Sequence, residues 1–259
     1  MDQQASGDGT VGKALDVLDR VAEKERPVRF AELLSESDHP KATLYRLLQT
    51  LVSQGMLSYR PEDQTYSLGM RLMRLAHKAW QRSSLAPIAR PFVDELSRTV
   101  GETIHLAQLD GAQVLYVDKR NAVSPVEMYS QAGKVGPSYC TGVGKAMLAF
   151  LPEPQLTHAI EQQSFYGYTE HTLTTEEDLR VELEIIRDSG IAFDREEHET
   201  GIICIAAPIL SRSGRPMGAL SITTSTKTKS FQHLRELQPV LTETAERISK
   251  AAADWQFPG

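Results

Sequence analysis

The sequence predicts an α+β protein with two domains joined by a helix. A stripe of leucines at helical spacing, followed by two short alternating segments, is typical of a winged helix-turn-helix. A stretch with basic but no acidic residues then predicts a linker helix. From about residue 103, alternating apolar residues predict an antiparallel sheet with helices segregated to its faces.

A helix is predicted from Pro40 through Leu51. The fixed φ of Pro40 suits a first helical position. Ser37 or Asp38 can cap its free amide groups. Its leucines follow the i, i+3, i+4, i+7 spacing of a buried face, a pattern that on its own also fits an ordinary core helix (Leu44, Leu47, Leu48, Leu51). The opposite face offers guanidinium and amide groups, which read guanine and adenine edges in a major groove. The candidate DNA contacts, including one from the wing, are Lys41, Ala42, Thr43, Tyr45, Arg46, Gln49 and Arg60.

The elements around this helix favour the DNA-binding interpretation. A longer helix from residue 11, with Val11, Leu15, Leu18, Val21 and Ala22 inward, and a short helix over 30–34 precede it. Alternating strands over 57–60 and 65–68, joined by the turn 61–64, follow it as a wing. The ordered set within roughly 60 residues favours a winged helix-turn-helix over an isolated core helix.

Charge is distributed unevenly along the chain. The formal net charge is −6, which by itself argues against a nucleic-acid-binding protein. Residues 11–83, however, hold 12 basic and 9 acidic residues, whereas residues 84–259 hold 16 basic and 23 acidic ones. No acidic residue lies between Asp63 and Asp94, and Arg71, Arg74, Lys78 and Arg82 recur along one side of the helix predicted over 70–81. This side is either a solvated surface or a contact for phosphate or an acidic partner.

Composition is typical of a globular protein, with 41% hydrophobic and 24% charged residues. The sequence has no run of 18 apolar residues and no signal peptide, so we expect a cytoplasmic protein that does not bind a membrane. Residues 1–9 are expected to be disordered. The two cysteines, Cys140 and Cys204, are too few for a disulfide framework or a structural zinc site and are interpreted as buried apolar residues.

The second domain begins near Ser84 with a helix through Val100. Strands are predicted over 104–109, 114–117 and 126–130 as an antiparallel meander, then helices over 143–150 and 176–189, strands over 190–193, 201–210 and 217–224, and a closing helix over 234–248. The predicted divisions are a disordered start at 1–9, a winged helix-turn-helix domain at 10–68, a linker helix at 69–83, and an effector-binding and oligomerisation domain at 84–255.

Four segments resemble the IclR family of transcriptional regulators, and the likeness extends over roughly residues 10–250. They are Pro40–Leu48, Gly101–Leu106, Gly136–Ala146 and Glu196–Pro208. The resemblance implies a winged helix-turn-helix, a linking helix and a GAF-like effector-binding domain, assembled as a homodimer or homotetramer. It implies a ligand-responsive regulator, a repressor of a carboxylic-acid or sugar-acid catabolic operon, that binds double-stranded operator DNA and needs no cofactor. Residues 128–130, with Gly133, Pro137 and Tyr139, resemble the KdgR-like, sugar-acid-responsive branch, although a keto acid or an aromatic acid remains an alternative effector.

The effector pocket is predicted around Thr141–Gly144, where free amide groups at a helix N-terminus suit a carboxylate. By resemblance, the amides of Gly142 and Val143 bind the acid and Asp194 reaches the hydroxyl or keto end of the ligand. The remaining wall corresponds to Ile202, Cys204, Ser221 and Thr223, with Met128 and Tyr139 as neighbours. At the entrance to the pocket, Ser138 and Tyr139 depart from the Leu and His that many relatives carry.

Other classes of function stay open at this point. A phosphate loop around Gly144 and Lys145 is excluded, because Tyr139 replaces its first glycine and Ala146 its Ser or Thr. Gly-x-Ser-x-Gly and His-Glu-x-x-His motifs are absent from the sequence. The alternatives are a cysteine-dependent enzyme or a metal site, using Cys140, Cys204, His198 and Asp194, and an interaction module that uses the basic helix instead of DNA. We predict no catalytic residue and no bound metal.

Overall fold

The computed structural model describes residues 9–124 and 126–253. Two compact units, divided after Arg82, make up the chain, and each is described by itself. The segment expected to be disordered, 1–9, lies outside the described residues except for Gly9, which precedes the first helix. Across the described ranges, none of the helices is long and apolar enough to cross a membrane.

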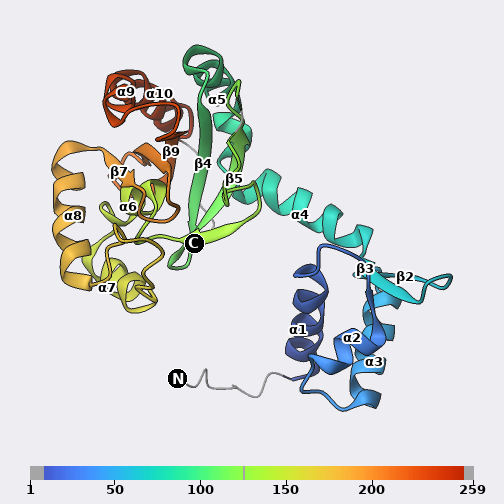
Figure 1. The fold of residues 1–259 in the computed structure, drawn as a ribbon. Coiled ribbons are helices and arrows are strands. Elements are labelled where there is room, and N and C mark those ends of the chain that lie inside the picture. The colour runs from blue at the N-terminus through green and yellow to red at the C-terminus, as the bar shows by residue number, and fades with distance from the viewer. Residues whose placement is uncertain (1–8, 125, 254–259) are drawn as a thin grey trace. The chain divides into compact units, whose positions relative to one another are not determined.

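The N-terminal unit has the predicted winged helix-turn-helix (Figure 1). Its elements are α1 (Thr10–Ala22), β1 (Val28–Arg29), α2 (Phe30–Ser35), α3 (Lys41–Ser53), β2 (Leu57–Arg60) and β3 (Thr65–Leu68), followed by α4 (Met70–Ser83). The wing is a three-stranded antiparallel sheet in the order β1-β3-β2. Strand β1 was not predicted, because two residues are too few to show an alternating pattern.

The leucine stripe of α3 forms the core of this unit, since Leu44, Leu47, Leu48 and Leu51 are all buried. They pack with Val17, Leu18 and Val21 of α1. The inward face predicted for α1 is wrong at both ends, where Val11, Leu15 and Ala22 are exposed. The buried residues of α1 lie in its second half, and Ala14 packs against the same core partly buried.

The C-terminal unit is built on one six-stranded antiparallel sheet in the order β6-β5-β4-β9-β8-β7 (Figure 1). Its strands are β4 (Thr103–Asp110), β5 (Gln113–Arg120), β6 (Val135–Pro137), β7 (Ala192–Arg195), β8 (Ile202–Leu210) and β9 (Pro216–Ser225). Its helices are α5 (Ala86–Val100), α6 (Gly142–Leu148), α7 (Glu153–Glu161), α8 (Glu176–Ser189), α9 (Phe231–Glu236) and α10 (Gln238–Ala251). The predicted α+β class with an antiparallel sheet is confirmed.

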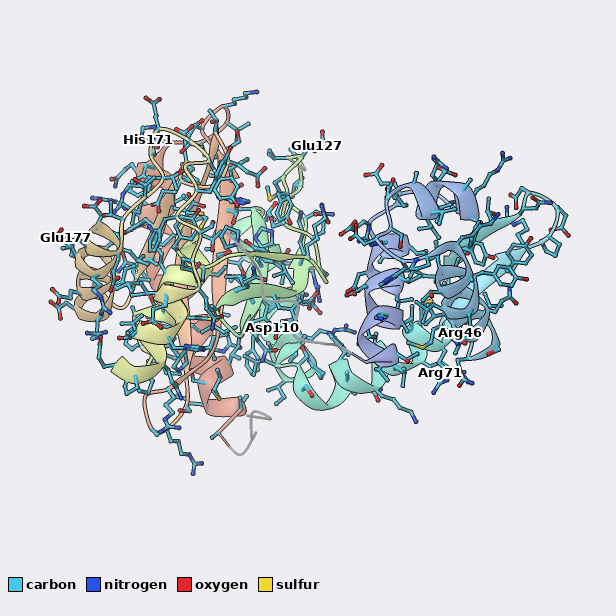
Figure 2. All side chains as sticks on the ribbon, turned by 90° about the horizontal axis from the view of Figure 1, so that it is seen from below. Arg46, Arg71, Asp110, Glu127, His171 and Glu177 are labelled. Atoms are coloured by element: carbon cyan, nitrogen blue, oxygen red, sulfur yellow. The ribbon has the colours of Figure 1, made fainter. Side chains whose placement is uncertain are left out.

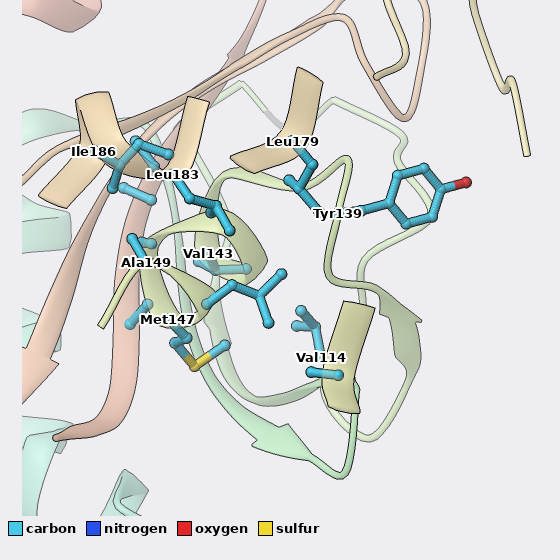
Figure 3. Close-up of a cluster of buried hydrophobic side chains, with 14 of the residues drawn as sticks. Val114, Tyr139, Val143, Met147, Ala149, Leu179, Leu183 and Ile186 are labelled. Carbon is cyan, nitrogen blue, oxygen red and sulfur yellow. The ribbon is translucent and has the colours of Figure 1, made fainter. Parts of the chain in front are cut away.

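Helix α6 lies against one face of this sheet, and all seven of its residues are buried. Val143 and Met147 of α6 share a core with Leu179, Leu183 and Ile186 of α8 (Figure 3). Helices α5 and α10 pack against each other and against the other face of the sheet. Helix α6 is therefore enclosed between the sheet and α8.

Three elements differ from the prediction. Residues 126–130 form no strand, and β6 takes that place beside β5. The backbone N–H of Tyr129 instead donates to the carboxylate of Glu199, at distances of 3.0 and 3.1 Å, so this segment is held by a side chain. The closing helix is two helices, α9 and α10, with Pro239 in the first turn of the second. Helix α7 was not predicted, because the prolines at its start are also typical of a loop. Proline suits the first turn of a helix as well.

Candidate functional site

The predicted DNA-reading face of α3 is exposed to solvent. Lys41, Ala42, Tyr45, Arg46 and Gln49 are exposed and Thr43 is half-buried. Arg46 extends from the surface of the N-terminal unit (Figure 2). Pro40 is the residue before the helix rather than its first residue, and no side chain caps the helix. The hydroxyl of Ser37, a predicted cap, accepts the backbone N–H of His39 instead, at 3.1 Å.

A hollow of about 740 Å³ separates the start of α3 from the wing. Six of its lining residues were not predicted as contacts: Arg29, Phe30, Ala31, Tyr59, Gln64 and Tyr66. Sequence reasoning missed them because they face α3 only through the tertiary fold. The one signal in the sequence was Tyr59, an aromatic residue in a predicted wing strand. In the structure Tyr59 is exposed, and its ring centroid lies 4.9 Å from that of Tyr66.

Arg60, the predicted wing contact, forms an ion pair within its own turn. Its guanidinium lies 3.2 Å from the carboxylate of Asp63, and both side chains are largely exposed. Asp63 also accepts the hydroxyl of Thr65 at 2.7 Å. An exposed pair of this kind contributes little to stability. Arg60 can therefore exchange Asp63 for a phosphate at small cost.

In the C-terminal unit, strand register brings the predicted effector residues together. Asp194 of β7 pairs with Cys204 of β8, and Cys204 pairs with Thr223 of β9. His105 of β4 pairs with Ser221 of β9, two residues from Thr223. Directly paired residues point to the same face of a sheet, as do residues two apart. These side chains consequently form one polar patch on the face covered by α6.

Gly142 lets the start of α6 approach this patch closely. A Cβ atom at Gly142 would lie 2.5 Å from the sulfur of Cys204. The backbone N–H of Gly142 is directed at that sulfur. At Gly144 a Cβ atom would clash with the backbone of Ser138. Both glycines are thus required by close contact, and neither serves only as a turn residue.

A small cavity of about 30 Å³, which we call the inner cavity, lies between α6 and the sheet. Seven of the predicted effector residues line it: Gly142, Val143, Asp194, Ile202, Cys204, Ser221 and Thr223. Six further lining residues were not predicted: His105, Tyr116, Ser130, Thr141, His198 and Glu199. Met128 and Tyr139 are buried but do not line it. The ring of Tyr139 packs 5.2 Å from Phe165, and its hydroxyl donates to the carbonyl of Tyr166 at 2.6 Å.

His105 lies at the base of the inner cavity and is buried. Its Nε2 lies 2.9 Å from the hydroxyl of Ser130, and its Nδ1 lies 3.2 Å from the hydroxyl of Thr223. Burial lowers the pKa of His105 to about 3, helped by the charge of Lys119. A neutral imidazole can donate from one nitrogen and accept at the other, so it fixes the two hydroxyl groups without adding charge.

Asp194 lines the inner cavity together with Gly142, and its side chain is buried. Burial raises its pKa from 3.8 to about 7, and the nearby charge of Glu197 adds to the effect. Its Oδ1 accepts the backbone N–H of Glu197 at 2.8 Å. Near neutral pH Asp194 can therefore either donate a proton to a ligand or accept one from it.

Glu197 in turn binds Lys145 of α6, whose side chain is completely buried. Both carboxylate oxygens of Glu197 lie 2.6 Å from Lys145 Nζ. Glu182 of α8 lies 3.3 Å from the same nitrogen. This charge cluster ties α6 and α8 to the loop 196–201, directly behind Asp194.

The geometry bears on the two enzyme-like alternatives. Burial raises the pKa of both Cys140 and Cys204. A cysteine nucleophile needs the opposite shift, because the thiolate is the reactive form. Among residues 9–124 and 126–253, no three His, Cys, Asp or Glu side chains are grouped so that they could hold a metal ion.

Comparison with known proteins decides the family. Residues 77–250 match the family model described as the bacterial transcriptional regulator IclR C-terminal domain, and residues 10–61 match the IclR helix-turn-helix domain. The chain belongs to the IclR family. The HTH-type transcriptional regulator KdgR of Escherichia coli (strain K12) is 33% identical over 258 residues, which cover 100% of this chain and 98% of that protein. The prediction of an IclR-family regulator is confirmed, and this similarity supports the KdgR-like branch.

Two solved structures of IclR proteins share the fold. The Thermotoga maritima IclR has 30% identity and a TM-score of 0.76, with 93% of this chain and 97% of that chain covered. An IclR homologue from Microbacterium hydrocarbonoxydans, complexed with 4-hydroxybenzoate, has 21% identity and a TM-score of 0.79, with 94% and 100% covered. The relatives are transcriptional regulators, which agrees with the prediction that the chain is no enzyme.

The raised pKa of Asp194 predicts a pH dependence of stability. In the unfolded chain an aspartate titrates near pH 4, whereas in the folded protein Asp194 keeps its proton to about pH 7. Its contribution to stability is therefore complete below about pH 4 and is lost as the pH rises towards 7. Asp194→Asn removes this titration, so its free energy of unfolding relative to the wild type should increase from pH 5 to 7 and level off above. Urea denaturation of both proteins at pH 5, 6, 7 and 8 measures this difference, and an equal difference at all four values would contradict the assignment.

Proposed function

We propose that this IclR-family chain represses an operon for the catabolism of a carboxylic or sugar acid, acting on operator DNA in the cytoplasm. A small carboxylic acid bound in the C-terminal unit changes its affinity for the operator. The observation that carries the proposal is that the two units hold different sites. The N-terminal unit exposes one face of α3, and the C-terminal unit encloses a polar cavity. A regulator that couples a ligand to DNA needs two such separate sites.

For the DNA side, Arg46 and Gln49 read base edges, while Lys41 and Arg60 contact phosphates. Ala42, Thr43 and Tyr45 complete the contact surface. The guanidinium of Arg46 is exposed, and a fork of donors of this kind can bind a guanine edge in a bidentate manner. The exposed Lys41 begins α3 and is suited to phosphate, which carries no sequence information.

For the effector side, the N–H groups of Gly142 and Val143 bind the carboxylate of the ligand. When the ligand binds, the N–H of Gly142 donates to a carboxylate oxygen of the ligand in place of the sulfur of Cys204, which is a weak acceptor. Asp194 recognises the hydroxyl or keto end, and Ile202, Cys204, Ser221 and Thr223 form the wall. Met128 and Tyr139 support the site from outside the inner cavity. The candidate effectors are sugar acids, keto acids and aromatic acids.

The assembly is proposed to be a homodimer or homotetramer. A single winged domain touches few base pairs, and symmetric operators are read by symmetric proteins. Helix α4 supports association because Met70, Met73 and Leu75 expose apolar side chains to solvent in the single chain. Two copies of the chain can cover these side chains.

The DNA assignment predicts different effects for two substitutions in α3. Arg46→Ala should cost about 1–3 kcal/mol on the operator and relax the preference at one base pair, because a base contact is lost. Lys41→Ala should weaken binding to all DNA similarly and reduce the salt slope by about one unit, because a phosphate contact is lost. Mobility-shift titrations on operator and random DNA at several salt concentrations distinguish the two. Wild-type affinity and base preference in Arg46→Ala would remove the recognition-helix assignment.

The effector assignment predicts that Asp194→Ala loses the response to the effector. The ligand then lacks its partner for the hydroxyl or keto group. Because coupling is reciprocal, an effector that lowers operator affinity must bind the operator complex more weakly by the same factor. Calorimetric titration of the acid into wild type and Asp194→Ala, with and without operator DNA, measures both quantities. If the two proteins bind the acid equally well, the effector site lies elsewhere.

The assembly proposal predicts a dimer or tetramer at micromolar concentration. Light scattering gives the mass, and footprinting should show protection of two half-sites related by symmetry. Met73→Glu in α4, which places a charge on the apolar surface, should shift the mass towards the monomer, whereas the matched Lys78→Glu should not. A wild-type monomer that protects a single half-site is the result incompatible with this proposal.

A further inference from the structure

A second, larger hollow adjoins the inner cavity of the C-terminal unit. It has a volume of about 600 Å³, and we call it the outer hollow. Tyr129, Tyr168 and Gln113 line it. His198 and Glu199 line both the outer hollow and the inner cavity. These two residues therefore form the wall between the two spaces.

The inner cavity is too small for most organic acids. At about 30 Å³ it has room for roughly two water molecules, since one water needs about 10–15 Å³ measured in this way. Benzene, with six carbon atoms, occupies a protein cavity of about 150 Å³. The inner cavity can hold the carboxylate end of a ligand, but the rest of a longer acid needs space on the other side of the wall.

The imidazole of His198 fills a slot between two tyrosine rings. Its centroid lies 5.4 Å from that of Tyr129 and 4.8 Å from that of Tyr168, with interplanar angles of 71° and 59°. These distances are those of favourable aromatic pairs. Tyr129 and Tyr168 are each more than 40% exposed, so the slot opens towards solvent.

The loop that carries His198 is held more firmly than the imidazole itself. The hydroxyls of Thr169 and Thr172 donate to the carbonyls of Glu196 and Glu197, each at 2.6 Å. The carboxylate of Glu196 accepts the N–H of Gly201, also at 2.6 Å. The imidazole, by contrast, has its nearest charged partner, Glu199, at 3.8 Å. Rotating this side chain out of the slot therefore leaves the hydrogen bonds of the loop backbone in place.

We propose that the slot between Tyr129 and Tyr168 is a binding subsite for the distal part of the effector, which displaces the imidazole of His198. The inference rests on the proposed function, because the carboxylate is placed at Gly142 and Val143. The ligand class is a carboxylic acid of about five or more carbons that ends in a ring or a hydroxylated chain. Tyrosine rings bind the flat or C–H-bearing face of such a group, and the side chain of Gln113 offers a hydrogen bond. Two- and three-carbon acids do not reach the subsite.

Two lysines contact residues that line these spaces, whereas the carboxylate of Glu199 lines both of them. The ammonium of Lys134 lies 4.6 Å from the ring centroid of Tyr129. Lys119, on β5, donates to the carbonyl of Ser130, a residue of the inner cavity, at 2.7 Å. These two ammonium groups offset the negative charge of Glu199, with which Lys119 interacts, so the path does not repel an anionic ligand.

The test uses calorimetry on the full chain with acids of increasing length. The probes are pyruvate, 2-keto-3-deoxygluconate and 4-hydroxybenzoate. At least one of the two longer acids should bind the wild type more tightly than pyruvate does. Binding of pyruvate alone, or of none of the three, overturns the proposal.

Two substitutions and a matched control identify the subsite. Tyr168→Ala should weaken binding of the longer acid about tenfold. His171→Ala should change it less than twofold, since His171 is an exposed ring-bearing residue close to Tyr168 in the chain and lines neither space. His198→Ala should leave affinity for the longer acid equal or tighter, because no side chain has to be displaced. Equal affinities for Tyr168→Ala and wild type, or a loss in His198→Ala as large as that in Tyr168→Ala, would refute the subsite.

Asp194→Ala separates this inference from the proposed function. If Asp194→Ala abolishes binding while Tyr168→Ala has no effect, the effector site stands and the subsite is wrong. If Asp194→Ala binds as the wild type does, the proposed effector site itself is wrong. Thermal unfolding of each variant checks that the chain is folded before titration.

Discussion

The C-terminal unit depends on one buried positive charge, that of Lys145. Lys145 lies on α6 and its side chain is completely buried. An unpaired ammonium group in such a place would cost several kcal/mol. Glu197 supplies both carboxylate oxygens at 2.6 Å, and Glu182 approaches from α8. This requirement fixes the loop after β7 against α6. Asp194, His198 and Glu199 all lie on or beside that loop, so the position of the inner cavity follows from the charge pairing.

The helical and strand patterns of the fold could be read from the sequence, because they depend on local spacing. The leucines of α3 and the apolar runs of β8 and β9 were predicted for this reason. Residues 126–130 were predicted as a strand from their alternation, yet the carboxylate of Glu199, 70 positions away, binds the N–H of Tyr129 instead. A tertiary contact of that kind leaves no local pattern. The same is true of α7, whose prolines indicate either a loop or a helix start.

Only some of the residues that line the inner cavity could be predicted from the sequence. Gly142, Asp194 and Cys204 came from the resemblance to a family, and the strand register brings them to one cavity. His105 and Ser130 also line the cavity, but only the pairing of β4 with β9 and the contact between Ser130 and His105 bring them there. Lys145 was considered only as part of a phosphate loop. Its buried pair could not be foreseen, because the sequence does not reveal which charges lie inside.

The two edges of the six-stranded sheet are its shortest strands, β6 with three residues and β7 with four. An edge strand exposes unpaired N–H and C=O groups, and a long flat edge invites another chain to extend the sheet. As edge strands, β6 and β7 each offer few such groups. Addition of a strand from another copy at β6 or β7 is therefore disfavoured.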